Sequence, residues 1–147
     1  MSKSDFLENA ILKLIFNATA IANIADNAAS APLTNLYWSL HTADPTDAGN
    51  QSSNETTYGS YARQAVARTT GGMTAATAGS TSPVANVTFP AATSPALPTV
   101  QSITHAGIGV AVSGATNLLY SGPVTPNINV SAGVQPILTT ASAVTED

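Results

Sequence analysis

One stretch, residues 33–49 with the sequence LTNLYWSLHTADPTDAG, holds the only tryptophan of the chain and its clearest strand pattern. Large apolar side chains recur there at every second position, which is the period of a β-strand with one buried face. Asp44-Pro45 directly follows and is typical of a turn, because proline presets the backbone angle φ and aspartate accepts a local backbone hydrogen bond. We therefore predict a strand over residues 35–42 whose core row is Leu36, Trp38 and Leu40.

The N-terminal region has a different period. Residues 5–24 carry apolar side chains on one helical stripe, with polar residues mostly off it, and this predicts an amphipathic α-helix. Asp5 and Glu8 resemble a capping box at its start. Because an isolated helix of this length is marginal in water, the stripe is expected to dock on the chain's own sheet or on a neighbouring subunit. The candidate assembly contacts are Leu7, Ile11, Leu14, Ile15 and Ile21.

A secretory signal and a membrane span are the alternatives for this region. Ala29-Ser30-Ala31 resembles a signal cleavage site, but Asp5 and Glu8 lie where a signal needs basic residues. Lys13 interrupts the apolar run, which is also well short of the roughly 20 residues that cross a bilayer. We therefore expect neither a cleaved signal nor a membrane anchor, and we interpret residues 26–32 as a linker.

Beyond the linker the pattern is that of short strands. Val87 and Phe89 alternate with polar residues before a proline, and residues 100–112 form the longest β-like run. The glycines in that run indicate a bulge or the close approach of another group. Residues 48–58 show no apolar periodicity and are expected to form an exposed loop, and Gly122-Pro123 is expected to bend the chain.

Short alternating strands separated by glycine and proline are typical of all-β domains. No second helical pattern lies between them, which disfavours a parallel α/β sheet. We predict a mainly β fold, an antiparallel β-sandwich or jelly-roll-like barrel preceded by one N-terminal amphipathic α-helix. The expected segments are 1–32 for helix and linker, 33–140 for the β-sandwich domain and 141–147 for a frayed tail. The expected core anchors are Leu36, Trp38, Leu40, Val87 and Phe89.

Charged residues make up only 8% of the chain, against roughly a quarter in ordinary soluble domains. Surface charge normally keeps a monomer soluble and protects strand edges, so its scarcity favours a protein packed against copies of itself or a partner. The net charge is −4. The few fixed cations are scattered, so no direct nucleic acid binding is expected. They are Lys3, Lys13, Arg63 and Arg68.

Histidine and carboxylate side chains are the candidate groups for catalysis or metal binding in this chain. His41, Asp44 and Asp47 are spaced by three residues and could converge on a cation. Turn chemistry explains Asp44 better, with His41 pointing outward from the strand. Ser39 would complete a Ser-His-Asp set, but no nucleophile elbow or glycine-rich oxyanion loop accompanies it, and His105 is expected to be a hydrogen-bonded strand residue. We therefore expect no catalytic, cofactor-binding or metal-binding residues and no enzymatic activity.

Five blocks, in chain order, carry a resemblance to a known family: LYWSLHTADPTDAG, YGSYARQAVAR, NVTFPAAT, ITHAGIG and LLYSG. They span roughly residues 33–138, and the string SLHTADP in the first block is the most specific. The chain resembles small structural proteins of tailed-phage virions, which are often labelled tail-fibre-like. The resemblance implies a non-enzymatic structural role in a phage particle, on the head surface or in the tail.

Within such a particle, a head decoration or cement protein is the first expectation, because the chain is too short and too weakly repetitive for a fibre shaft. Such a protein would form homo-oligomers on the major capsid protein and stabilise the shell through repeated small contacts. The alternative is a tail or tail-fibre component, including a receptor-facing one, for which Tyr58 and Tyr61 are the suggestive aromatic residues. The expected location is the virion, assembled in the host cytoplasm.

Overall fold

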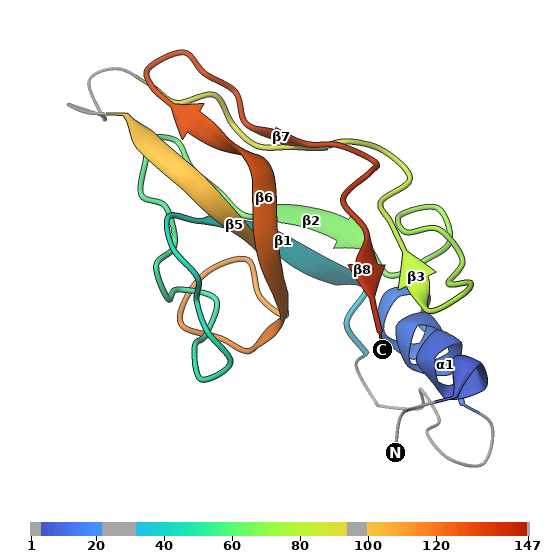
Figure 1. The fold of residues 1–147 in the computed structure, drawn as a ribbon. Helices are drawn as coiled ribbons and strands as arrows, with labels where there is room; N and C mark the ends of the chain where they lie inside the picture. The colour runs from blue at the N-terminus through green and yellow to red at the C-terminus, as the bar shows by residue number, and fades with distance from the viewer. Residues whose placement is uncertain (1–3, 22–31, 94–99, 147) are drawn as a thin grey trace. The chain divides into compact units, whose positions relative to one another are not determined.

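The computed structural model describes residues 4–21, 32–93 and 100–146 (Figure 1). Over these residues the fold is mainly β, with antiparallel strand pairs and one N-terminal α-helix, which confirms the predicted class. The elements are α1 (Asp5–Phe16), β1 (Asn35–His41), β2 (Gln64–Ala67), β3 (Ser80–Thr81), β4 (Val87–Thr88), β5 (Gln101–Gly109), β6 (Leu118–Val130), β7 (Ile137–Leu138) and β8 (Val144–Thr145).

The chain divides into two compact units that interleave along the sequence. The first unit comprises Met1–Leu36, Val66–Asn86 and Leu138–Asp147, and the second comprises Tyr37–Ala65 and Val87–Ile137. The sequence instead predicts consecutive segments at 1–32, 33–140 and 141–147. The units interleave because their contacts join segments that are far apart in the chain, which a reading of local patterns does not detect.

In the first unit the helix is shorter than predicted. α1 ends at Phe16 and is capped by Asn17, whereas the apolar pattern predicts a helix as far as Ile24. Ala18 has a φ of 52°, and this left-handed backbone conformation cannot continue an α-helix. Residues 22–31, which include the end of the predicted helix, most of the linker and the candidate cleavage site, lie outside the described residues. No helix in the described part of the chain is long and apolar enough to cross a membrane.

The start of α1 also differs by one residue from the prediction. Ser4 is the N-cap, and its hydroxyl oxygen accepts a hydrogen bond from the Leu7 backbone N–H at 3.4 Å. The predicted capping box assigned the cap to Asp5 with Glu8 three residues later. Serine and aspartate are similarly good caps, so the sequence pattern alone did not separate the two positions.

The core-facing side of α1 is centred on Leu12 and Phe16, which are 0% and 1% exposed. This stripe is displaced from the predicted one by about one residue, or roughly 100° around the helix. Apolar side chains lie on both stripes, so the tertiary contacts decide which is buried. Of the candidate assembly contacts, Ile21 is buried and the others are half-buried: Leu7, Ile11, Leu14 and Ile15.

Arg68 attaches the C-terminal end of α1 to the rest of the first unit. Its Nε and Nη2 donate to the backbone carbonyls of Ile15 and Leu14 at 2.5 and 2.7 Å. Its Nη1 donates to the carbonyl of Leu33 at 2.7 Å. The last carbonyls of a helix have no partner inside it, so the guanidinium satisfies two of them and holds the chain that enters β1. The helix, which lies beside β3 (Figure 1), therefore docks within its own chain.

The C-terminal residues do not fray as expected. β8 pairs antiparallel with β3, with Thr145 opposite Ser80 and Val144 opposite Thr81. Val144 is only 8% exposed. The tail lacks a local strand pattern because only two of its residues pair, and the pairing is with a segment more than sixty residues earlier in the chain.

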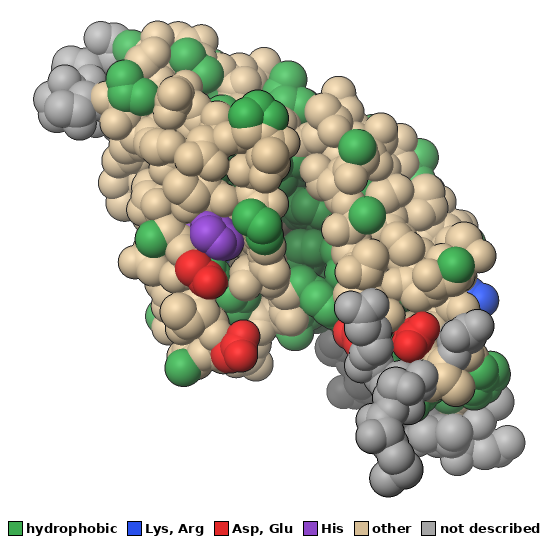
Figure 2. All heavy atoms as spheres, viewed as in Figure 1, with side chains coloured by type: hydrophobic (Ala, Val, Ile, Leu, Met, Phe, Trp, Pro, Cys, Tyr) green, Lys and Arg blue, Asp and Glu red, His purple; other side chains and the backbone are tan. Residues whose placement is uncertain are grey.

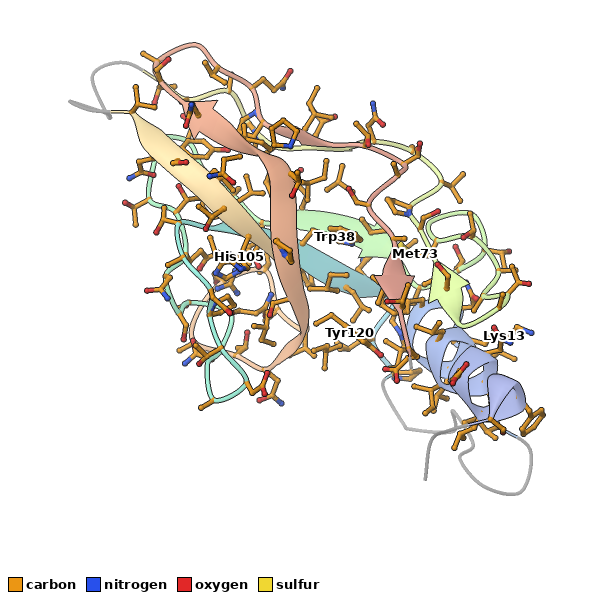
Figure 3. The ribbon with its side chains drawn as sticks, in the orientation of Figure 1. Lys13, Trp38, Met73, His105 and Tyr120 are labelled. Atoms are coloured by element: carbon orange, nitrogen blue, oxygen red, sulfur yellow. The ribbon has the colours of Figure 1, made fainter. Side chains whose placement is uncertain are left out.

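The principal sheet has the strand order β2-β1-β5-β6. β5 pairs antiparallel with both neighbours, so that Trp38 lies opposite Ile108 and Ile108 lies opposite Tyr120. Figure 3 shows Trp38 and Tyr120 on these strands. The β5–β6 register shifts between Ile103 and His105 and again between Ile108 and Gly109, with the extra residues on β6. Of the two readings of the glycine-rich run, the close approach of another group is the one observed, because side chains pack directly against Gly107 and Gly109.

Both faces of β1 are covered. The five expected core anchors, Leu36, Trp38, Leu40, Val87 and Phe89, are all between 0% and 4% exposed. The alternate residues Ser39 and His41 are also 0% exposed, although the period-two pattern predicts that this face is open and that His41 points outward. The pattern misleads because polar side chains can be buried when hydrogen-bonded partners cover them.

β6 is a single strand of 13 residues. The sequence predicts a bend at Gly122-Pro123 between a strand near residues 118–120 and a separate short strand at residues 127–131, whereas one strand spans both segments. Pro123 lies opposite His105 in the β5–β6 ladder. A proline is tolerated in a sheet chiefly on an edge strand, and β6 is at the end of the strand order.

The burial of Leu40 gives a test of the core. Leu40→Ala should lower the free energy of unfolding by about 2–5 kcal/mol, because it leaves a cavity at a site with 0% exposure. Urea unfolding followed by the fluorescence of Trp38, the single tryptophan, measures this change. Leu33→Ala is the matched control: Leu33 is 45% exposed, and its loss should be within about 0.5 kcal/mol. Equal midpoints for the two variants would contradict the assignment of the core.

Candidate functional site

A group of buried polar side chains lies on the second face of β1. Ser39 Oγ is 2.9 Å from Nε2 of His41, and Nδ1 of the same ring is 2.8 Å from the backbone carbonyl oxygen of Ser53. A carbonyl oxygen only accepts, so Nδ1 carries the proton and Nε2 accepts from the Ser39 hydroxyl. The neutral imidazole therefore has a partner at each nitrogen.

Burial lowers the pKa of His41 below its ordinary value of 6.5, while the hydrogen bond to Ser53 and the charge of Glu55 partly oppose this shift. The imidazolium form would lose solvation and could no longer accept the Ser39 proton. His41 is thus held in the neutral form that its contacts require.

The Ser39–His41 contact does not have the surroundings of a catalytic pair. A Cβ placed on Gly107 would lie 2.6 Å from His41 Nε2 and 2.8 Å from Ser39 Oγ, so the β5 backbone packs directly against both reactive atoms. Asp44 is exposed, and its carboxylate accepts from the Thr46 backbone N–H at 2.8 Å, which is the turn role predicted for it. The arrangement holds β1, β5 and the loop together and leaves no space for a substrate.

The remaining histidine and carboxylates do not converge on a cation. Asp47 is exposed, whereas His41 is buried, and the described residues contain no group of three histidine or carboxylate side chains that could hold a metal ion. His105, labelled in Figure 3, is half-buried, and its Nδ1 is 2.9 Å from Thr104 Oγ1. His105 is therefore the hydrogen-bonded strand residue that the sequence predicts.

The neutral, buried His41 predicts a pH dependence of stability. The unfolded chain takes up a proton at His41 near its ordinary pKa of about 6.5, whereas the folded chain resists it. Stability from this site is therefore fully present above about pH 6.5 and is lost as the pH falls toward the lowered pKa. Thermal melting between pH 7.5 and 5, values chosen to bracket about 6.5, measures this loss.

His41→Gln should flatten this pH dependence, whatever its effect on stability at neutral pH. His105→Gln is a graded comparison: it removes the neighbouring charge that helps to lower the pKa of His41, so it should reduce the slope less than His41→Gln does. A wild-type melting temperature that rises as the pH falls through this range would contradict a neutral His41 in the folded chain.

A buried ion pair lies next to this site. Arg63 binds Glu55 through two hydrogen bonds of 2.7 Å, from Nε to Oε1 and from Nη2 to Oε2. The side chains of Arg63 and Glu55 are 2% and 15% exposed. The hydrogen bond to Glu55 raises the pKa of Arg63, so the guanidinium is firmly charged. Such a bidentate pair is strong and fixes the relative orientation of its two side chains.

The ion pair also fastens two loops. Arg63 Nη1 donates to the Ala111 carbonyl at 3.0 Å and Nη2 to the Gly114 carbonyl at 2.9 Å, and both acceptors lie between β5 and β6. Glu55 Oε1 accepts from the Tyr61 hydroxyl at 2.9 Å, and the same hydroxyl accepts from the Leu40 backbone N–H at 3.0 Å. One charged pair thus connects β1, the segment before β2 and the β5–β6 loop.

Gln51 provides a second attachment for the same loop. Its Oε1 accepts from the Thr116 hydroxyl at 2.6 Å and from the Ala111 backbone N–H at 3.1 Å, and its Nε2 donates to the Tyr37 carbonyl at 3.3 Å. A Cβ on Gly109 would lie 2.1 Å from Gln51 Cδ. Only glycine therefore leaves room for this fully buried amide.

Residues 48–58 were expected to form an exposed loop, and this expectation is wrong for the side chains that carry the contacts. Gln51, Thr56 and Tyr58 are between 0% and 2% exposed. Tyr58 donates to the Pro90 carbonyl at 3.0 Å, and burial raises its pKa to about 12. Tyr61 packs edge-on against Tyr58 and stacks on Phe89, with centroid distances of 5.3 and 6.2 Å. The two tyrosines suggested for receptor contact are structural.

A sequence signal for this network does exist, although it is weak. The chain has only two arginines and three glutamates, and such scarce charges are compatible with a buried pair. Sequence spacing cannot show that Glu55, Arg63 and the 111–114 segment meet, because their separations have no regular period.

Removing one member of the ion pair should be costly. Glu55→Gln leaves the buried guanidinium of Arg63 without its counter-charge, and we expect a loss of about 3–5 kcal/mol in the free energy of unfolding. Chemical denaturation measures this loss. Asp47→Asn, the same change at an exposed carboxylate, is the control and should be nearly neutral. A double variant, Glu55→Gln with Arg63→Met, should lose less than the sum of the two single changes; strict additivity would show that the pair is not coupled.

The internal use of the arginines leaves few positive charges outside. Arg63 is 5% exposed, and Arg68 donates to three backbone carbonyls. Lys13 is the remaining cation of the described residues, and in Figure 3 it points away from the body of its unit. Figure 2 accordingly shows a face made mostly of uncharged polar and hydrophobic atoms. The surface suits contacts governed by shape and hydrogen bonds more than by charge.

Comparison with known proteins identifies a family for this chain. Residues 2–145 match the family model described as Podophage GP4 fiber I protein gp80. The chain therefore belongs to this family of phage virion structural proteins. No curated protein sequence matches it. The resemblance inferred from the five sequence blocks is confirmed at the level of the family.

Proposed function

We propose that this chain is a non-enzymatic fibre component of a phage tail, built into the particle through contacts with other copies of itself and with tail proteins. The observation that carries the proposal is the family match over nearly the whole chain to a protein described as a fibre protein. The family match favours the tail, whereas the sequence alone favours head decoration, with the tail as its alternative.

The structure offers physical support for a structural role. The Glu55–Arg63 pair, Gln51 and His41 hold the connecting loops by hydrogen bonds and ionic contacts that exclude water. Loops fixed in this way present a constant surface, so little conformational entropy is lost when a partner binds. The scarcity of surface charge removes a source of repulsion between identical neighbours.

The absence of enzymatic activity belongs to the same proposal. Its support is the burial of Ser39 and His41, both 0% exposed, beneath the β5 backbone. A nucleophile and base must reach a substrate within hydrogen-bond distance. These two groups contact only the protein that encloses them.

Head decoration is the second candidate. The chain is short and lacks the repeats of a fibre shaft, so the same fold is also suitable as a module on the shell, bound to the major capsid protein. The two candidates differ in stoichiometry: symmetry multiplies a decoration protein over the whole shell, whereas a fibre is present at few positions.

Quantitative mass spectrometry of purified particles distinguishes the two. We expect a copy number far below that of the major capsid protein and close to the symmetry of the tail. A ratio near one copy per capsid subunit, or a simple fraction such as one third, would replace the tail proposal with head decoration. Absence from the particle would overturn both.

A further inference from the structure

His41 lies in a row of cross-strand neighbours on the second face of β1. On one side it pairs with His105 of β5, and on the other it forms an isolated bridge with Glu55. Directly opposite residues of an antiparallel pair have their side chains on the same face, with Cβ atoms roughly 5 Å apart. The two imidazoles and the Glu55 carboxylate are therefore neighbours on one face.

The charges around His41 balance only while both imidazoles are neutral. Glu55 is bound to Arg63, so its negative charge is already matched. β6 adds no charge, since Pro123 lies opposite His105 and no residue of β6 is charged. Protonation of the imidazoles at acid pH therefore adds positive charge to an enclosed site where the described residues place no unpaired carboxylate.

Two walls of unequal strength enclose His41. One is β5, which is paired on both sides, to β1 and to β6 (Figure 1). The other is the segment 48–58, whose Ser53 carbonyl accepts from His41 Nδ1. Backbone hydrogen bonds of 2.8 and 2.9 Å join this segment to β1 and to the residue that follows it. Displacing the segment therefore breaks fewer backbone hydrogen bonds than opening the sheet, so it is the easier way to expose His41 to water.

We propose that residues 48–58 are an acid-released clamp: when His41 takes up a proton, this segment leaves the second face of β1 while the sheet β2-β1-β5-β6 stays paired. The inference goes beyond the proposed structural function, because it gives a condition under which the fixed loops of the second unit become free.

The clamp also holds the β5–β6 loop through Gln51. The Gln51 backbone N–H donates to the Thr116 carbonyl at 2.9 Å, and its Oε1 accepts from the Ala111 N–H and the Thr116 hydroxyl. Release of the clamp removes these contacts, so the loop that carries Val112, which is 60% exposed, loses its fixed position. Water then solvates Arg63, and its guanidinium is not left enclosed without a counter-charge.

Amide hydrogen exchange of the full chain, followed by NMR, tests the clamp at single residues. The reporter amides donate between the clamp and its neighbours: Thr42, Gln51, Thr56 and Ala111. After correction for intrinsic exchange rates, their opening equilibrium constants should rise by up to about thirtyfold between about pH 7.5 and about pH 5. This is the factor by which a proton taken up at an ordinary pKa of about 6.5 shifts the equilibrium. The Ala92 N–H, which donates to the Val134 carbonyl at 2.9 Å in the same unit, should show no such rise.

Two histidine variants test which group takes up the proton. His41→Gln removes the titrating group and should abolish the acid-induced rise. Because His41 is buried and this variant can fail to fold, the half-buried His105 provides a second test. His105→Glu places a carboxylate opposite His41, which stabilises the imidazolium in the closed state, and should reduce the rise at least about threefold.

The matched controls keep the charge or move it. His105→Lys retains a positive charge opposite His41 and should keep the full rise. Thr88→Glu adds a carboxylate at an exposed residue of β4 in the same unit and should also keep it.

Three results would overturn the clamp. The first is exchange at the reporter amides that does not change with pH, and the second is a rise that His105→Glu leaves intact. The third is an equal rise at Ala92, because acid would then act through global unfolding. None of these results bears on the fibre proposal, since exchange is measured on the purified chain and copy number on the particle.

Discussion

The buried pair of Glu55 and Arg63 is the interaction on which the second unit most depends. Once an arginine with 2% side-chain exposure is enclosed, its charge must be matched and its donors filled, because an unpaired buried charge costs several kcal/mol. Glu55, the Ser52 hydroxyl and two carbonyls of the β5–β6 loop meet this demand. The segment between β1 and β2 is thereby held against the sheet, and the second face of β1 is closed to water.

The other polar contacts follow from this closure. With water excluded, His41 must be neutral and Gln51 must find partners for its amide, and both do so through backbone groups and hydroxyls of the loops they face. The space they occupy exists because β5 carries Gly107 and Gly109 opposite Ser39 and Tyr37. The small residues of β5 and the polar residues of the loop therefore form one packing arrangement.

The scarcity of charged side chains also determines the character of the surface. Both arginines make their contacts within the fold, so they add little positive charge to the described surface. The longest described strand, β6, contains no charged residue. In a free monomer this is a liability for association. The family match places the chain among virion structural proteins, for which we propose contacts between copies.

The sequence by itself determined the fold class, the position of β1 with its core row at Leu36, Trp38 and Leu40, and the turn role of Asp44. Each of these depends on a local period or on the chemistry of adjacent residues. Only the tertiary structure decided that His41 is buried and that Glu55 pairs with Arg63. It also decided which side of α1 faces the core, and that β6 continues through Pro123 as one strand. These outcomes depend on which distant segments cover a given face, and a buried polar residue has the same sequence pattern as an exposed one until its partners are known.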